Sequence, residues 1–518
     1  MMEIELQLLM APAHNAQLLK HPLIKAHARG PARTDDLTAH YFDTPDLHLM
    51  RHRAGLRVRQ MDGVWIQTMK AGGSMQSGLH RQHEWETPVT RAWPQLGKLR
   101  KEVDDKRREM LNLPDLKNHL EVLFTVAVQR TRWDIDFEGT HIELALDQGH
   151  IEHDGQRVPV NEVELELKSG TPASLFAFAL QLLHDIPLRL SYTNKALRGY
   201  ALCRDSGIAV VKAAPVVLPH QASTAQALVT ILSNCLQQIQ GNEAGVTGSA
   251  DPESVHQMRV GVRRLRSALK LFCNAAPCPD ALLNEIEWLG NILGAARDWE
   301  VLRDISLPRV PDDATNDAGL ASLRALAQQT AREQRAQAAQ AILSPRYTRL
   351  QLSLALWMQQ ISASGDAHAE AHANALHNAQ LAAPVSHFAH HAMRDLHKKM
   401  LHRAEKAAGG EERAVHRLRI AGKRVRYALE FFAVLYRHAS SARYLEALTD
   451  MQDALGRHND VMVADRLLGE LQQSHASAGG IGHAISFARG YLLGQASASP
   501  GIDDFHHLGD ASRLPRRA

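Results

Sequence analysis

The first 205 residues contain short runs in which apolar and polar side chains alternate. The segment EIELQL, residues 3–8, places two glutamates and a glutamine on one side and three aliphatic residues on the other, because successive strand residues point to opposite faces. The same alternation returns, between turn signals, in GLRVRQ (55–60), VWIQTMK (64–70), HEWETPV (83–89), HIELALDQG (141–149) and EVELELKSG (162–170). This pattern predicts an antiparallel, strand-rich domain with a few helices.

Charges of both signs collect on the polar faces of these predicted strands. A single polar face would fit a solvated edge strand, but these faces together carry Glu3 and Glu5, Arg57 and Arg59, Thr68 and Lys70, Glu84 and Glu86, Glu143 and Asp147, and Glu162, Glu164 and Glu166. Strands that close around a polar lumen explain the set better, and closure also removes exposed sheet edges. Crowded carboxylates attract a hard divalent cation such as Mg²⁺ or Mn²⁺. The arginines and lysines then need an anion, and a chain of phosphates satisfies both sets.

The order of these motifs resembles the CYTH superfamily of triphosphate tunnel metalloenzymes. The resemblance covers about residues 2–203 and includes EIELQL, GLRVR, the lysine of TMK, IELALDQG, VELEL and KALRGY at 195–200. That superfamily includes class IV adenylate cyclases, thiamine triphosphatases and inorganic triphosphatases. The resemblance implies an eight-stranded antiparallel tunnel and metal-dependent hydrolysis or cyclisation of a triphosphate.

The resemblance also implies roles for individual residues of this chain. The implied metal ligands are Glu3, Glu5, Glu143, Glu164 and Glu166. The implied catalytic residues are Lys70, Glu84 and Asp147, and the implied phosphate-binding residues are Arg57, Arg59, Arg130, Lys195 and Arg198. Two positions depart from the family pattern: Gln7 replaces a lysine, and Gln82 replaces an arginine, with Arg81 one residue earlier. Because both changes remove a cation, a protein that binds polyphosphate without hydrolysing it stays an alternative.

The chain of 518 residues is too long for a single core, so two or three domains are expected. A segment with two prolines at 206–222 predicts a linker, and helical spacing extends over 223–496 before a tail, 497–518, that we expect to be disordered. The sequence HQMRVGVRRLRSALKLF at 256–272 returns 160 residues later as HRLRIAGKRVRYALEFF, and LGAARDWEVLRD at 293–304 returns 162 residues later as LGRHNDVMVADR. These repeats predict two related helical bundles, about 223–340 and 385–496.

Each copy of the repeat places basic residues on one helical face. The first copy contributes His256, Arg259, Arg263, Arg266 and Lys270, and the second contributes His416, Arg419, Lys423 and Arg426. One such face is typical of a solvated surface, but two copies in the same register favour a polyanion, because its binding offsets repulsion between like charges. The region 220–496 resembles the CHAD domain, which implies binding of inorganic polyphosphate. The histidines lack partners at metal-ligand spacing, so phosphate contact or hydrogen bonding between helices is favoured over metal binding.

The cysteines, the apolar runs and the aromatic residues bear on where the protein is found and on what it binds. Four cysteines without a CxxC motif fit a reducing compartment, and no apolar run approaches about 18 residues. We therefore expect a cytoplasmic protein without a membrane partner. Nucleic acid is disfavoured because aromatic stacking motifs are missing from the sequence.

The expected fold class is α+β. It consists of an eight-stranded antiparallel β tunnel with flanking helices, followed by an all-α domain of two repeated bundles. The predicted activity is metal-dependent hydrolysis of tripolyphosphate to pyrophosphate and phosphate, with a helical domain that binds polyphosphate. Adenylate cyclase, thiamine triphosphatase and a noncatalytic polyphosphate-binding scaffold are the alternatives.

Overall fold

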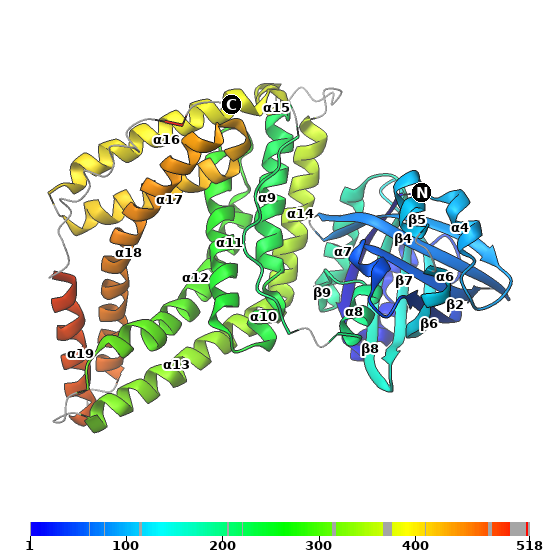
Figure 1. Cartoon of the computed structure of the whole chain (residues 1–518), viewed down its shortest axis with the longest axis horizontal. Coiled ribbons are helices and arrows are strands. Elements are labelled where there is room, and N and C mark those ends of the chain that lie inside the picture. The colour runs from blue at the N-terminus through cyan, green and yellow to red at the C-terminus, as the bar shows by residue number, and fades with distance from the viewer. Residues whose placement is uncertain are drawn as a thin grey trace. The chain divides into compact units, whose positions relative to one another are not determined.

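The computed structural model describes residues 2–61, 63–76, 78–112, 116–204, 207–219, 221–312, 317–365, 375–409, 411–474, 479–497 and 514–515. The chain divides into two compact units (Figure 1). The first comprises Met1–Gly207 with Leu343–Gln359, and the second comprises Ile208–Ile342 with Gln360–Ala518. Apart from residues 497, 514 and 515, the tail expected to be disordered lies outside the described residues.

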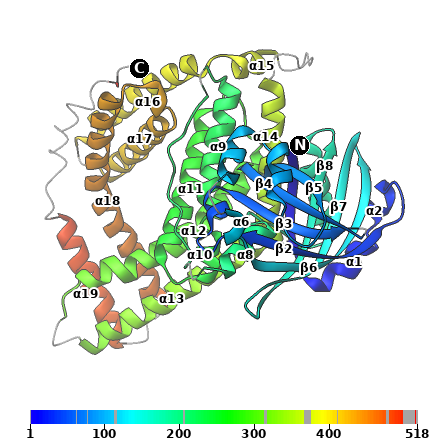
Figure 2. The same ribbon diagram turned by 45° about the vertical axis from the view of Figure 1, so that its right-hand side comes forward.

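Eight antiparallel strands of the first unit close into a barrel (Figure 2). In chain order they are β1 (Met2–Met10), β2 (Arg33–Asp43), β3 (Ala54–Met61), β4 (Val64–Gln76), β5 (Leu79–Val89), β6 (Glu121–Phe137), β7 (Thr140–His153) and β8 (Gln156–Ser169). Around the barrel they follow the order β5-β4-β3-β2-β6-β7-β8-β1, and pairing of β1 with β5 closes the ring. A short ninth strand, β9 (Leu188–Leu190), pairs with the end of β1. The predicted eight-stranded tunnel is confirmed.

Short helices surround the barrel and cover its apolar outer surface. They are η1 (Pro12–His14), α1 (Asn15–Leu19), α2 (Pro22–His27), α3 (His48–Arg51), α4 (Leu96–Glu102), α5 (Asp105–Leu111), α6 (Leu116–His119), α7 (Pro172–Asp185) and α8 (Lys195–Leu202). Leu6 and Leu8 of β1 form one buried cluster with Phe176 and Phe178 of α7. Because these leucines point outward into apolar packing, the alternate residues of β1 point into the barrel.

Helix α14 (Pro345–Gly365) contributes to the core of the first unit although it lies far along the chain. Leu352 and Ala355 of this helix are fully buried in the same cluster as Phe178. An amphipathic segment between the two sequence repeats therefore completes the packing of the strand-rich unit.

Replacing Leu352 with alanine is expected to destabilise the protein by about 2 to 3 kcal/mol, because it leaves a cavity in a closed apolar cluster. Thermal unfolding of the full chain measures the effect. Leu343→Ala is the matched control, since Leu343 is 42% exposed, and it should change stability by less than about 0.5 kcal/mol. Equal effects of the two substitutions would contradict the packing of α14 described above.

The second unit is helical. Its helices are α9 (Thr224–Gln240), α10 (Glu243–Gly248), α11 (Pro252–Leu271), α12 (Asp280–Val301), η2 (Leu302–Ser306), η3 (Leu307–Arg309), α13 (Asp317–Leu343), α15 (Ala375–Ala382), α16 (Val385–Ala407), α17 (Glu412–Phe431), η5 (Ala433–Leu435), α18 (His438–Ser474) and α19 (Gly479–Ser497). The repeated segments form α11 and α17, which pack against each other. The ring of Phe388 stacks on Phe272 at a centroid distance of 4.4 Å and lies 6.3 Å from Phe432. The equivalent phenylalanines of the two repeats thus share one aromatic cluster.

Residues 207–219 form neither helix nor strand, but side chains of the second unit hold them. The Asn242 amide contacts both backbone polar groups of Val211, at 3.1 and 2.8 Å, and Asn234 donates to the carbonyl of Ala214 at 3.1 Å. None of the helices in the described parts of the chain combines the length and apolarity needed to span a bilayer.

Candidate active site

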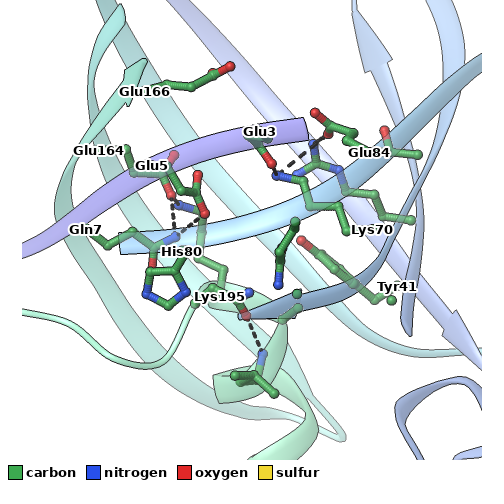
Figure 3. A pocket seen from close by; sticks show the side chains of 18 of the residues that line it. Glu3, Glu5, Gln7, Tyr41, Lys70, His80, Glu84, Glu164, Glu166 and Lys195 are labelled. Carbon is green, nitrogen blue, oxygen red and sulfur yellow. Dashed lines mark hydrogen bonds and ion pairs between the residues drawn. The ribbon is translucent and has the colours of Figure 1, made fainter. Parts of the chain in front are cut away.

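The barrel surrounds a cavity of about 650 Å³ whose lining includes many charged side chains (Figure 3). Its carboxylates are Glu3, Glu5, Glu84, Glu86, Glu143, Glu164 and Glu166. Its cations are Arg53, Arg57, Arg59, Lys70, Arg130, Arg132, Lys168 and Lys195. The structure therefore brings together most of the residues that the sequence predicted for this site. Asp147 and Arg198 are not among the lining residues, and their predicted roles stay predictions.

The two signs of charge occupy different walls of the barrel. The carboxylates come from β7, β8, β1 and β5, which are consecutive around the ring, whereas most of the cations come from β6, β3 and β4. Across the acidic wall, Glu166 stands opposite Glu5 on one neighbouring strand and opposite Glu143 on the other. We call Glu5, Glu143 and Glu166 the carboxylate row.

At the border between the walls, acids and bases pair directly. Lys70 Nζ lies 2.5 Å from Glu3 and 3.6 Å from Glu84 (Figure 3). Arg57 lies 3.6 Å from Glu84, and Arg59 lies 3.2 Å from Glu86. The carboxylates of β5 are therefore neutralised by the basic wall.

The carboxylate row has fewer cations than carboxylates: in the described structure Lys168 pairs with Glu166 at 2.7 Å and with Glu143 at 3.5 Å, and no ion pair involves Glu5. Burial, together with repulsion from Glu164 and Glu3, raises the pKa of Glu5 to about 8 against the opposing effect of Lys70 and Lys195. Burial also raises the pKa of Glu166. Glu5 therefore holds a proton at neutral pH unless another cation replaces it. Hard carboxylate oxygens without enough counter-charge suit Mg²⁺ or Mn²⁺, so the residues present fit the metal that the sequence predicted.

A second carboxylate cluster is already neutralised by side chains. Asp147, Glu162 and Glu164 present oxygen atoms within 4.8 Å of one another, close enough to hold a metal. The Lys195 ammonium, however, donates to all three at 2.7, 2.5 and 2.6 Å. An ammonium has three donors, so these bonds use all of them. The Lys195 ammonium thus occupies the position between these carboxylates.

Two arginines reinforce this cluster. Arg130 makes two bonds to Asp147, at 2.7 and 2.6 Å, and one to Glu164 at 2.5 Å. Arg198 pairs with Glu162. Burial alone would raise the pKa of Glu164, but Lys195 and Arg130 hold it well below its usual range. Glu164 therefore stays ionised, whereas Glu5 takes up a proton.

Gln7 joins the two groups of carboxylates. Its buried side-chain amide donates to Glu5 at 2.8 Å and to Glu164 at 3.3 Å (Figure 3). The amide thus fills the place of the missing lysine without supplying its charge. Gln82 lines the cavity opposite Glu3, whereas Arg81 pairs with Ile4 in the register of the outer face.

The basic wall has unused hydrogen-bonding capacity. The buried Nε atoms of Arg57, Arg59 and Arg132 have no partner within the described structure. Repulsion from Arg57, together with burial, lowers the pKa of Arg59 to about 10. An anion in the cavity would relieve this repulsion and could accept hydrogen bonds from these guanidinium groups.

Among the described residues that line the cavity, the charged residues Arg53, Arg132 and Lys168 were not predicted from the sequence. Arg132 follows Arg130 by two residues, and Lys168 follows Glu166 by two, so strand alternation places each beside a predicted neighbour. That alternation could have identified both. Arg53 carried no such signal, since it precedes β3 in a left-handed conformation with φ of 54°.

The helical unit gathers four of its predicted basic residues into a cluster, which we call the basic cluster: Arg259 and Arg263 of α11 with Arg419 and Lys423 of α17. Burial and repulsion from these three arginines, Arg263 first, lower the pKa of Lys423 to about 7. Burial also lowers the pKa of Arg259, with Asp298 opposing at 3.5 Å. These like charges are therefore held together at an electrostatic cost.

The other predicted basic residues have different surroundings. Arg266 lies 3.5 Å from Glu287, and Arg426 lies 2.9 Å from Glu430. Lys270 is exposed. Burial and repulsion from Arg297 lower the pKa of His256 to about 4, so this histidine is neutral at pH 7. His416 and Arg419 line a separate cavity of about 430 Å³.

Comparison with protein families gives two matches along this chain. The CYTH domain model matches residues 1–200, and the CHAD domain model matches residues 230–469. The chain therefore contains a CYTH domain and a CHAD domain. The CHAD domain is similar to the crystal structure of the CHAD domain from the plant Ricinus communis, with 46% sequence identity and a TM-score of 0.54. That match covers 60% of this chain and 100% of the plant chain.

The CYTH domain is similar to an inorganic triphosphatase from Haemophilus influenzae. The two sequences are 35% identical over 163 residues, which is 31% of this chain and 44% of the relative. The alignment therefore spans less than half the length of that curated relative.

Proposed function

We propose that the CYTH domain is a metal-dependent inorganic triphosphatase that hydrolyses tripolyphosphate to pyrophosphate and phosphate. The observation that carries the proposal is the separation of charge in the cavity of the barrel. One wall carries seven carboxylates and, among the described residues, a single lysine, whereas the other carries arginines and a lysine and no carboxylate. A phosphate chain with a divalent cation complements both walls. The similarity to an inorganic triphosphatase supports the same activity.

The carboxylate row and Glu3 would hold Mg²⁺ or Mn²⁺. Glu164 would contribute a further negative charge next to this site. When bound, the metal would neutralise charge on the phosphate oxygens that it contacts. Arg57, Arg59, Arg130 and Arg132 would bind the remaining oxygens from the opposite wall. Positioning and charge neutralisation supply most of the catalysis in phosphoryl transfer, and this cavity offers both.

The proposed catalytic residues lie at the border between the walls. Lys70 would stabilise negative charge on the attacked phosphoryl group, and Glu84, 3.6 Å from Lys70, would orient the attacking water. Asp147 would act as a positioning residue, since it holds Arg130 and Lys195. Water adds to the terminal phosphorus and loses a proton, which passes by way of Glu84 to the solvent. The bridging P–O bond breaks, and pyrophosphate leaves with the electron pair of that bond.

One observation favours a second candidate, a tunnel that binds polyphosphate without hydrolysing it. The Gln7 amide carries no charge, and both of its donor contacts go to glutamates. A residue in that state adds no positive charge to the phosphate site.

We further propose that the CHAD domain binds inorganic polyphosphate through the basic cluster. Four cations held close together across two packed helices store repulsion that a linear polyanion converts into attraction. Burial and repulsion from the three arginines together lower the pKa of Lys423.

Phosphate release from tripolyphosphate, ATP and thiamine triphosphate, with and without Mg²⁺ or Mn²⁺, tests the first proposal. Rapid release from tripolyphosphate only when metal is present is the expected result. Preference for ATP or thiamine triphosphate would replace the substrate assignment. Binding of tripolyphosphate without release from any of the three would establish the noncatalytic alternative.

A further inference from the structure

Lys168 is a cation on the acidic wall of the cavity. Among the described residues that line the cavity from β7, β8, β1 and β5, it is the sole lysine or arginine. It is the last of four alternating charged residues on β8, after Glu162, Glu164 and Glu166. Strand alternation therefore directs it to the same face as the glutamates.

The ammonium of Lys168 sits on the carboxylate row. Its Nζ lies 2.7 Å from Glu166 and 3.5 Å from Glu143. The third member of the row, Glu5, faces Glu166 from the neighbouring strand and is only 6% exposed. Lys168 itself is about one-third exposed, at 34% of its side-chain surface, so it can leave the row without breaking the core.

The cluster of Asp147, Glu162 and Glu164 contains a lysine with a different environment. Lys195 is 9% exposed and divides three short bonds among Asp147, Glu162 and Glu164. Lys168 makes one short and one long contact and is much more accessible. The buried ammonium is built to stay in place, whereas the accessible one can exchange with another cation.

We propose that Lys168 is an exchangeable counter-ion of the carboxylate row, which neutralises Glu143 and Glu166 until a divalent cation displaces its ammonium. The proposal rests on the proposed metal-binding function of that row. The Lys168 ammonium competes with the metal for the carboxylate oxygens of Glu143 and Glu166, so it lowers the metal affinity of the row. In the metal-free protein it keeps these two carboxylates paired with a positive charge. The displaced side chain remains at the cavity, where it can contact a phosphate oxygen.

The test is Mn²⁺ binding to the metal-free full chain, measured by the electron paramagnetic resonance signal of free Mn²⁺. Lys168→Met is expected to bind Mn²⁺ about tenfold more tightly than wild type, because the competing charge is removed. Lys168→Arg, which keeps the charge, should remain near wild type. Lys101→Met is the control, because Lys101 is an exposed lysine of α4 that does not line the cavity.

Weaker or unchanged Mn²⁺ binding by Lys168→Met would overturn the proposal, since a lysine that only orients the glutamates loosens the site when it is removed. A second readout is acetylation by acetic anhydride, followed by mass spectrometry. Mg²⁺ should increase modification of Lys168 and leave Lys101 unchanged, and equal modification with and without Mg²⁺ would count against displacement. Neither readout requires turnover, so an inactive tunnel that binds metal leaves the inference standing. Absence of Mn²⁺ binding to both wild type and Lys168→Met would refute the row as a metal site and the inference with it.

Discussion

Glu5→Gln is expected to lower metal-dependent phosphate release from tripolyphosphate by about two to three orders of magnitude. Glu5 lies in the carboxylate row, and loss of one charge-stabilising group at a phosphoryl site has effects of this size. The amide keeps the shape of the side chain and can replace neither the negative charge nor the metal-ligand strength of a carboxylate. Steady-state phosphate release and Mn²⁺ titration of the same preparation measure the two consequences.

The pKa of Glu5 sets the pH dependence of this effect. Below pH 8 most metal-free molecules carry a proton on Glu5, so a metal must displace it. Wild-type metal affinity should therefore rise by up to about tenfold per pH unit towards pH 8 and level off above it. Glu5→Gln should lose this dependence.

Stability should change in the opposite sense to activity. The folded-state pKa of Glu5 lies above its unfolded value, so its contribution to stability is present at low pH and is lost as pH rises through about 8. Glutamine never ionises, and the metal-free variant at pH 9 is expected to be at least as stable as wild type.

Glu102→Gln is the matched control, because this exposed glutamate ends α4 and does not line the cavity. It should keep both activity and metal affinity. A Glu5→Gln protein with full metal-dependent turnover would show that the carboxylate row is not the metal site.

The barrel was predictable because its signal is local. A period of two, read along EIELQL or VELEL, tells which face of a strand is polar, and the quantity of charge on those faces favours a lumen over solvent. Arg132 and Lys168 obey the same rule. Their positions in the cavity were therefore available in the sequence, even though no motif drew attention to them.

The pairing inside the cavity was not predictable, because it depends on register between distant strands. Lys195 was expected to bind phosphate, yet the structure places its three donors on Asp147, Glu162 and Glu164. Only the alignment of β7 with β8 and the approach of α8 bring these groups together. The protonation of Glu5 could not be predicted either. Its main cause is burial of the side chain, and the spacing of residues in the sequence does not show how deeply a side chain is buried.

Helical spacing predicted which side of each helix is basic, but it could not tell which basic residues of that side lie close together. Arg259 and Arg263 meet Lys423 from the facing helix, whereas Arg266 and Arg426 have nearby carboxylates of their own. A face defined by i, i+3 and i+7 positions is broad. Which of its members approach the partner helix depends on how α11 and α17 cross.

Replacing Arg263 and Lys423 together with methionine is expected to weaken binding of long-chain polyphosphate by about one hundredfold at low salt. The two residues lie at the centre of the basic cluster, where Arg263 is the foremost repelling charge on Lys423. Methionine keeps the aliphatic volume and removes both charges. Binding to the full chain in EDTA, measured as a function of salt, should also show a slope lower by about 1 to 2, as expected when two phosphate contacts are lost.

The pH dependence of the same binding separates a specific cluster from general basicity. The pKa of Lys423 is about 7 in the absence of a ligand, and a bound polyanion favours its charged form. Binding should therefore take up a proton, so affinity falls as pH rises through 7 in wild type and stays flatter in the double variant. Arg332→Met with Lys398→Met removes the same charge from exposed positions on α13 and α16, and should leave polyphosphate affinity within about twofold of wild type. Equal losses of polyphosphate affinity in the two double variants, or equal losses of affinity for polyphosphate and for DNA, would show that the CHAD domain is a nonspecific basic surface. Only a cluster of mutually repelling cations couples ligand binding to protonation of Lys423.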